Sequence, residues 1–341
     1  MTELKDKELR EIFALFSDKA PADVRVTDTG RGEKDFRHAA VFTAEDGERL
    51  VIKLSDNDFT SPERIGVWQR TAAEYRALGY YSPGIFPARD GTFPYVSYKG
   101  RRCVAYAEEF AKYRILEERT DDDTEGNESD EVFRDKWIMT AKVAAKRFDF
   151  APFPSGYCLF ERFCPSDKTD EVTEQAAEWK AQADKLPPCF GKQVGRIWAL
   201  WQKNRAELEK VYGTLPTSVF QADLNTTNLL VDDEGNFVGV FDYNLCGREV
   251  FLNYIFRENY GRDFERELEK IRRVLEISSE HYEFSREERQ YALMLYRCLK
   301  PIRKDFEIEE LIKSGADEAA VSECLDRIEH YLTADIDFFH K

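Results

Sequence analysis

The sequence contains few of the residues that build disulfide scaffolds or zinc sites. Its seven cysteines are odd in number and form no C-x-x-C pair, which indicates free thiols and the reducing cytoplasm. The four histidines are scattered, which argues against a His/Cys zinc site. No apolar run reaches the roughly 18 residues that a transmembrane helix needs. Met1–Phe16 carries basic residues and lacks a continuous apolar stretch, so no signal peptide is expected.

Basic residues are also fewer than acidic ones. The chain has 50 basic and 66 acidic residues, a net charge of −16. Because nucleic acids and anionic membranes bind positive surfaces, neither is an expected partner. Residues 117–131 hold nine acidic residues and one arginine. Such a block is ordinarily a solvated loop, and the alternative is a role in attracting a cationic substrate.

What the chain does have is enough apolar residues, 42% of its 341 residues, to fill one large core or two linked ones. Residues 22–110 are rich in short β-branched runs separated by turn dipeptides such as Asp46-Gly47. Five strands are predicted there: Val24–Thr27, Ala39–Thr43, Leu50–Leu54, Phe93–Tyr98 and Arg102–Ala107. Ser61 and Pro62 predict the N-terminus of a helix over Glu63–Leu78.

From about Ala111 the chain becomes mainly helical. Helical periodicity is present in six segments: Trp137–Arg147, Ala176–Lys185, Val194–Tyr212, Asp263–Ser278, Arg286–Leu299 and Glu318–Leu332. One β interlude, Ser218–Asn244, interrupts them. These patterns predict an α+β fold with a small sheet part at 1–110 and a helical part at 111–341.

The β interlude carries the residues that point to chemistry. Asp223 and Asn228 form a D-x-x-x-x-N pattern before a predicted hairpin, and the second strand of that hairpin ends at Asp242. Phosphoryl transfer needs a carboxylate to accept or orient a hydroxyl proton, a position that suits Asp223. Magnesium prefers oxygen ligands, which Asn228 and Asp242 can supply. The alternative is that Asp223 and Asn228 are ordinary turn residues.

At these residues the sequence resembles the aminoglycoside phosphotransferase and choline kinase-like superfamily, whose pattern is H-G-D-x-x-x-x-N followed by a strand pair ending in I-D-[WFY]. The resemblance implies a protein-kinase-like two-lobed fold that uses ATP and Mg²⁺. It makes Asp223 the catalytic residue and Asn228 and Asp242 the magnesium ligands. It also implies that 1–110 is the lobe covering ATP and that 111–341 carries the catalytic loop and the acceptor site.

The same resemblance assigns nucleotide contacts in the first part of the chain. Lys53, within the apolar strand LVIKL, would bind the α- and β-phosphates. The alternative is a solvent-facing lysine on an edge strand. Glu74, in the helix that follows, would be the glutamate that pairs with this lysine. Glu63 at the start of that helix is a competing candidate.

Two backbone segments complete the expected nucleotide site. The end of the fifth strand, with Glu108, Glu109 and Phe110, matches the hinge whose main-chain groups would contact adenine. Gly30 and Gly32 lie in the loop between the first two strands and would cover the phosphates. A full G-x-G-x-x-G motif is absent, so this loop could equally be an ordinary turn.

The sequence departs from the family pattern at several positions. Gln221 replaces histidine, Ala222 replaces glycine, and Asn225-Thr226-Thr227 replaces the usual His-Pro-Gly. Glutamine carries a donor and an acceptor, so Gln221 is expected to brace the loop as histidine would. Tyr243-Asn244 follows Asp242, and no A-P-E motif comes after it, which argues against a protein kinase.

Together these features predict an ATP-dependent phosphotransferase acting on a hydroxyl of a small molecule such as an aminoglycoside, amino alcohol or sugar. The acid-rich composition favours a cationic acceptor. One alternative is a catalytically silent, nucleotide-binding regulatory module, which Gln221 would favour. Another is an inert scaffold that binds partners through its acidic insert.

Overall fold

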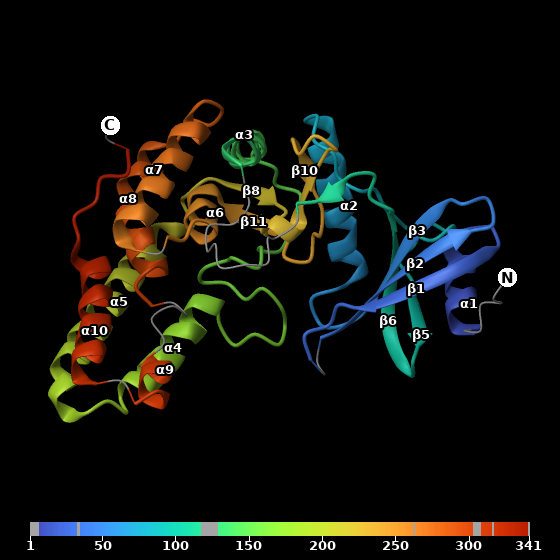
Figure 1. The fold of residues 1–341 in the computed structure, drawn as a ribbon. Helices are drawn as coiled ribbons and strands as arrows, with labels where there is room; N and C mark the ends of the chain where they lie inside the picture. Colours follow the sequence, from blue (N-terminus) through green and yellow to red (C-terminus); the bar gives the residue numbers. More distant parts are fainter. Residues whose placement is uncertain are drawn as a thin grey trace. The chain divides into compact units, whose positions relative to one another are not determined.

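The computed structural model describes residues 7–32, 35–116, 129–261, 263–302, 308–315 and 317–339 (Figure 1). Most of the acidic block, residues 117–128, lies outside the described residues. The chain divides into two compact units. The first comprises Met1–Met139, Cys164–Ser166 and Gln221–Gly247, and the remaining residues form the second. The segment with Asp223, Asn228 and Asp242 therefore belongs to the same unit as Lys53. The functional boundary at residue 110 stays a prediction.

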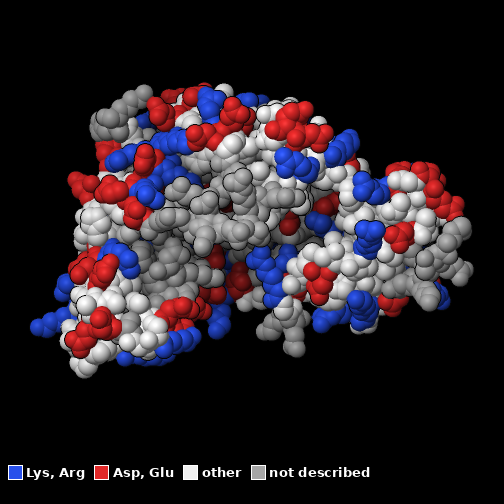
Figure 2. Space-filling model, viewed as in Figure 1, with Lys and Arg blue, Asp and Glu red and all other residues white. Residues whose placement is uncertain are grey.

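Acidic and basic side chains are intermixed on the face of the molecule drawn in Figure 2. The surplus of negative charge is not gathered there into one acidic surface among the described residues. No helix of this described part is both long and apolar enough to cross a membrane.

The main sheet of the first unit is antiparallel. Its strands are β1 (Pro21–Asp28), β2 (Phe36–Ala44), β3 (Arg49–Asp56), β4 (Ile85–Phe86), β5 (Tyr95–Tyr98) and β6 (Arg101–Glu109). They follow the order β1-β2-β3-β6-β4, and β5 also pairs with β6. The five predicted strands are confirmed, and the two-residue β4 is an addition. The hairpin turns contain Gly47 and Gly100, whose positive φ angles of 86° and 74° suit glycine.

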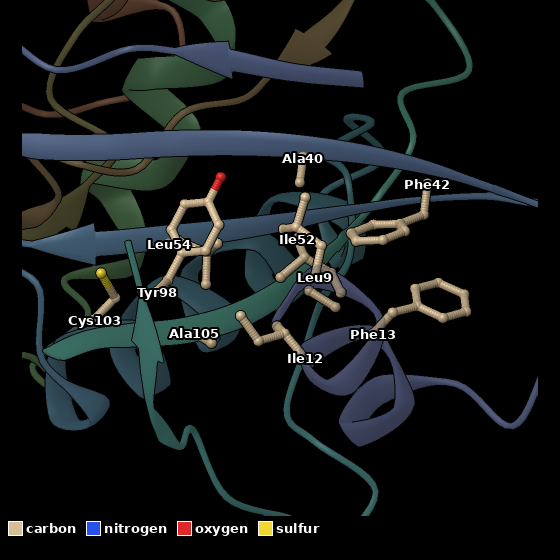
Figure 3. Packing of buried hydrophobic residues seen from close by; sticks show 11 residues of the cluster. Leu9, Ile12, Phe13, Ala40, Phe42, Ile52, Leu54, Tyr98, Cys103 and Ala105 are labelled. Carbon is tan, nitrogen blue, oxygen red and sulfur yellow. The ribbon is translucent and has the colours of Figure 1, made fainter. Parts of the chain in front are cut away.

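The two faces of this sheet carry different residues because successive side chains point to opposite sides. Lys53 of β3 lies opposite Tyr106 of β6, and Ile52 lies opposite Ala107. The face with Ile52 is covered by α1 (Lys7–Phe16), a helix that the sequence analysis did not predict. Figure 3 shows Leu9, Ile12 and Phe13 of α1 packed against it. Lys53 points to the other face.

Helix α2 (Pro62–Ala77) starts where the sequence predicts. The side chain of Ser61 accepts a hydrogen bond from the backbone N–H of Arg64 at 3.3 Å, and Pro62 occupies the first turn. Trp68 of α2 contacts the ring of Tyr106 edge-on, with ring centroids 5.9 Å apart. Since Tyr106 and Lys53 share a face of the sheet, α2 packs on the face that carries Lys53.

A second, three-stranded sheet completes the first unit. It contains β7 (Arg114–Ile115), β9 (Leu229–Val231) and β10 (Phe237–Val240), in the order β10-β9-β7. The hairpin between β9 and β10 is the one that the sequence predicts, and its turn uses Gly235 at a φ of 90°. A short 3-10 turn, η2 (Thr226–Asn228), leads into β9. Asn228 and Asp242, the two candidate metal ligands, therefore lie just before and just after this hairpin.

The second unit is mainly helical (Figure 1). Its elements are α4 (Glu171–Ala183), η1 (Pro188–Phe190), α5 (Gly191–Tyr212), β8 (Thr217–Phe220), α6 (Phe251–Glu258), α7 (Phe264–Ser279), α8 (Arg286–Leu299), α9 (Ile308–Lys313) and α10 (Glu318–Thr333). Helix α3 (Asp130–Lys146) and strand β11 (Gly247–Val250) contribute residues to both units. All six predicted helices are present, so the predicted kinase-like α+β class is confirmed.

Candidate active site

Lys53 lies in the middle of the main sheet. Strand β3 pairs with β2 on one side and β6 on the other, so the interpretation of Lys53 as an edge-strand lysine is wrong. Its Nζ lies 3.1 Å from Oε2 of Glu108, and the two side chains are 20% and 9% exposed. Burial alone would lower the pKa of Lys53, but the charge of Glu108, aided by Asp242, raises it above its ordinary value. The ammonium therefore stays charged.

The resemblance predicts a different partner for Lys53. Glu74 lies on α2, and its carboxylate is 3.9 Å from Arg70, one helical turn away. Glu63 is an exposed residue in the first turn of the same helix. Among the described residues, Lys53 makes its ion pair with Glu108 and with neither of these two glutamates. The expected Lys53–Glu74 pair is absent from this structure.

Gln221 connects the two segments that carry the catalytic candidates. Its Oε1 accepts a hydrogen bond from the backbone N–H of Asp223 at 2.9 Å. Its Nε2 donates to the carbonyl oxygens of Asp242 at 2.7 Å and Phe241 at 3.0 Å. The side chain is fully buried. The amide therefore uses both its donor and its acceptor, as the sequence analysis predicts for a residue replacing the family histidine.

Asp223 sits in a strained loop and in an unfavourable place for a negative charge. The preceding Ala222 has a φ of 62°, a conformation that non-glycine residues rarely adopt. Burial raises the pKa of Asp223, the Asn225 N–H at 3.4 Å partly offsets this, and the charge of Asp242 raises it further. The backbones of Asp223 and Asp242 lie in one region, because the Gln221 side chain hydrogen-bonds to both. A carboxyl with a raised pKa is a better proton acceptor than an ordinary aspartate.

Asn228 and Asp242 are held by backbone contacts beside this loop. The side-chain Nδ2 of Asn228 donates to the backbone carbonyl oxygen of Asp223 at 3.3 Å, and the backbone carbonyl of Asn228 accepts from Phe241 N–H at 3.1 Å. Asp242 has a φ of 61°, and its Oδ1 accepts from Asn244 N–H at 3.3 Å. The D-x-x-x-x-N segment is thus fastened to the end of β10, where Phe241 pairs with Asn228 and Asp242 follows.

These donors suit a hard cation that is shared with a ligand. The described residues contain no group of three or more His, Cys, Asp or Glu side chains that could hold a metal. Asn228 and Asp242 offer amide and carboxylate oxygens, which magnesium prefers, and phosphate oxygens and water would complete its coordination. The residues present therefore fit Mg²⁺ bound together with a nucleotide.

The loop expected to cover the phosphates is closed on itself. Gly30 N–H donates to Oδ1 of Asp28 at 2.9 Å, and Arg31 N–H donates to Oδ2 of Asp35 at 3.1 Å. A Cβ atom on Gly30 would lie 2.3 Å from the Asp35 carbonyl oxygen, so glycine is required there. Gly32 adopts a φ of 120°. Phosphates could reach these N–H groups only after the carboxylates have released them.

The expected hinge is also occupied by protein contacts. Glu109 N–H donates to the Gly84 carbonyl at 2.8 Å, and the Glu109 carboxylate pairs with Arg76 and Lys112. The Phe110 ring lies 3.6 Å from the guanidinium carbon of Arg49. Glu108 contributes a buried side chain, whereas the sequence analysis expected only its main chain. The available signal was a carboxylate at the end of an apolar run, similar to Lys53 in LVIKL.

A family profile and several solved structures are similar to this chain. The sequence profile of the phosphotransferase enzyme family (APH) matches residues 33–251. No curated protein matches the sequence. The fold is similar to that of a microcompartment-associated aminopropanol kinase, with a TM-score of 0.55, 14% identity and coverage of 95% of this chain and 94% of the other. It is also similar to the amicoumacin kinase hAmiN in complex with AMP-PNP, Ca²⁺ and Ami, with a TM-score of 0.54, 14% identity and coverage of 98% and 96%.

Proposed function

We propose, because the chain belongs to the phosphotransferase enzyme family, that it transfers the γ-phosphate of ATP to a hydroxyl group of a small molecule. The observation that carries this proposal is the support that Gln221 gives to both Asp223 and Asp242. The buried Gln221 amide holds the loop with Asp223 to the segment with Asp242. Such fixed geometry suits phosphoryl transfer, which depends on the positioning of the reacting groups.

Each residue of the constellation has a role in this proposal. Asp223, with its raised pKa, accepts the proton of the acceptor hydroxyl as the oxygen attacks phosphorus. Asn228 and Asp242 hold Mg²⁺, which neutralises charge on the transferring phosphoryl group when it is bound. Lys53 donates hydrogen bonds to the α- and β-phosphates from an ammonium whose pKa the Glu108 carboxylate raises. Residues 1–110 would cover ATP, and 111–341 would carry the acceptor site.

The acceptor in this proposal is a small hydroxylated compound such as an amino alcohol, an aminoglycoside-like compound or a sugar. An aminopropanol kinase and an amicoumacin kinase share the fold. The net charge of −16 favours a cationic acceptor through faster encounter. The seven cysteines are free, which suits a reducing compartment such as the cytoplasm.

The second candidate function is a nucleotide-binding module that no longer turns over. The observation in its favour is the closed state of the loop at Gly30, where carboxylates occupy N–H groups that phosphates would need. The hydrogen bonds of Gln221 weigh against it, because they supply the support expected of the family histidine. An inert scaffold would have no use for Lys53, Asp223 and Asp242 in one unit.

A coupled ADP-release screen tests the proposal. Purified protein with Mg·ATP is assayed against aminoglycosides, amino alcohols and neutral sugars, with the Asp223→Asn variant as the control. Acceptor-dependent ADP release that the variant lacks supports the phosphotransferase. ATP binding without release for any acceptor class would favour the silent module.

A further inference from the structure

The nucleotide-binding face of the main sheet carries a buried ion pair that the family resemblance does not assign. We propose that the Glu108 carboxylate positions Lys53 for the nucleotide phosphates, the part that the resemblance gives to Glu74. The inference rests on the proposed function, since it concerns the lysine that would bind ATP. It makes Glu108 a positioning residue, because it acts through Lys53.

The strand register explains why these two side chains meet. Lys53 lies opposite Tyr106, and Val51 lies opposite Glu108, so Glu108 is diagonal to Lys53 on the same face. Diagonal neighbours across an antiparallel pair are within reach of long side chains. Both residues belong to inner strands of the sheet, which pair on both sides. Their 3.1 Å contact is therefore set by regular backbone geometry and not by a mobile loop.

Two other glutamates of this region are engaged elsewhere, and Asp242 acts on Lys53 through its charge without an ion pair among the described residues. Glu74 lies beside Arg70 on α2. Glu109, the next residue along β6, pairs with Arg76 and Lys112. Glu108 has Lys53 as its ion-pair partner. The pair is thus specific to these two residues.

The chemistry of the pair suits a phosphate-binding lysine. An ammonium has three N–H donors, and one bond to Glu108 leaves the others for phosphate oxygens. The groups that act electrostatically on Lys53 are Glu108, Tyr106 and Asp242. Glu108 is the one within hydrogen-bond distance, so it both holds the amine in place and keeps it protonated in a buried position. Removing Glu108 should leave a more mobile, more readily deprotonated amine.

Acylation of Lys53 tests the pair without any assumption about catalysis. Nucleotide-free protein is treated with acetic anhydride, and modification of each lysine is followed by mass spectrometry. Glu108→Gln should accelerate labelling of Lys53 about tenfold for each unit by which the amine pKa falls. Glu74→Gln should leave it at the wild-type rate. Glu48→Gln, which removes one of the two carboxylates paired with Lys19, is the matched control and should affect Lys19 alone.

Steady-state kinetics test the role in nucleotide use. Glu108→Gln should lower kcat/KM for ATP by roughly 10- to 100-fold, through both a higher KM and a lower kcat, as expected for the loss of a charged hydrogen bond. Glu108→Asp should recover part of that loss, because it restores the charge. Glu74→Gln should have a smaller effect than Glu108→Gln, whereas the family resemblance predicts the reverse order.

The outcomes separate this inference from the proposed function. Unchanged Lys53 labelling in Glu108→Gln, or equal acceleration in Glu74→Gln, would overturn the inference. Altered labelling in a protein that transfers no phosphate to any acceptor would uphold the pair and reject the phosphotransferase. If Glu108→Gln does not fold, Glu108→Asp decides the matter. Its Lys53 should label faster than wild type at a near-native melting temperature, and an unchanged rate would contradict the inference.

Discussion

Gln221 joins three backbone groups through one buried side chain, and its chemistry explains how the catalytic loop tolerates the loss of the family histidine. Its acceptor holds the N–H of Asp223, and its donor reaches the carbonyls of Phe241 and Asp242. Each end of the amide is therefore needed for a different segment. A change that removes only one end should loosen only one of them.

Substitutions at Gln221 should separate these two contributions. Gln221→His should keep single-turnover phosphoryl transfer within about tenfold of wild type, as suggested by the exchange of one neutral hydrogen bond for another. Gln221→Glu keeps an acceptor for Asp223 N–H but places a carboxylate against two carbonyl oxygens, so it should melt lower than Gln221→His. Equal melting temperatures and rates for the two variants would contradict the bracing role.

For single residues, the sequence indicated the candidate site residues more readily than their side-chain partners. Asp223, Asn228, Asp242 and Lys53 could be located because the spacing of the loop and hairpin is local. The Lys53–Glu108 pair could not, because it depends on the register between β3 and β6, strands separated by about fifty residues.

The β9–β10 hairpin is the element that delivers Asp242, and it depends on a close backbone approach at Gly239. Tyr81 N–H donates to the Val238 carbonyl at 2.7 Å, and Val240 N–H donates to the Tyr81 carbonyl at 3.1 Å. A Cβ atom at Gly239 would lie 1.7 Å from that Tyr81 oxygen. The hairpin has no room for a side chain there.

Gly239→Ala should therefore destabilise the protein by about 1–3 kcal/mol or more, as overpacking of a close contact does. Gly66→Ala is the matched control. Gly66 is inside α2 and a Cβ there meets nothing within 4 Å, so alanine should stabilise by roughly 0.5–1 kcal/mol. Chemical denaturation measures both. A stable Gly239→Ala protein would show that the Tyr81 contact is not required.

Strand β2 carries a buried titratable group that should make stability depend on pH. His38 is 6% exposed and stacks on Phe36, with ring centroids 4.4 Å apart. Burial and the charge of Lys99 lower the pKa of His38, and Asp28, 3.7 Å from Nε2, opposes them. The unfolded chain therefore binds a proton at a higher pH than the folded one does.

Stability should accordingly fall as the pH drops below about 6.5, the ordinary histidine value, because the unfolded state gains the proton first. The contribution is present above that pH and is lost toward the lower folded pKa. His38→Gln should reduce the slope of melting temperature against pH between about 5 and 7. Parallel slopes for wild type and His38→Gln would refute this.

The elements that the sequence predicted have a clear period or turn, such as the Asp46-Gly47 hairpin or the Ser61-Pro62 start of α2. Of the elements that it did not predict, α6 and β4 lack such a signal, whereas α1 has its buried residues Leu9, Ile12 and Phe13 at helical spacing. In α6, the six residues Phe251–Phe256 are all buried, so there is no polar face to reveal a helix. Strand β4 has only two residues, Ile85–Phe86. Its pairing with β6 is a tertiary contact that no local pattern encodes.

At the level of the whole molecule, the candidate site depends on which unit contains the segment with Asp223 and Asp242. Gln221–Gly247 forms part of the same unit as the main sheet, although more than a hundred residues separate them in sequence. The change from strands to helices in the sequence predicts a boundary at residue 110. It does not predict that Gln221–Gly247 belongs to the same unit as the main sheet. The acceptor also lies beyond sequence patterns, since one fold accommodates many acceptors.

Mg·ATP should stabilise the folded protein, because the candidate ligands belong to the folded state. At about 100 times its dissociation constant, the ligand should add roughly 2.7 kcal/mol to the free energy of unfolding. Asp242→Ala should lose most of that gain, since it removes the carboxylate expected to hold the metal. Thermal melts with ATP alone, Mg²⁺ alone and both together provide the controls. Melting curves that do not respond to saturating Mg·ATP would argue against nucleotide binding.

Single-turnover transfer of the γ-phosphate, with excess enzyme over labelled ATP and an acceptor panel, tests the central claim most directly. Hydrolysis to water serves as the readout if no acceptor responds. Asp223→Asn should slow transfer by about 10²- to 10⁴-fold, the usual contribution of a general base. Nucleotide binding by the variant should be nearly unchanged, because the proposed metal and phosphate contacts remain. Equal rates for wild type and Asp223→Asn across the panel would contradict the account and favour the silent module.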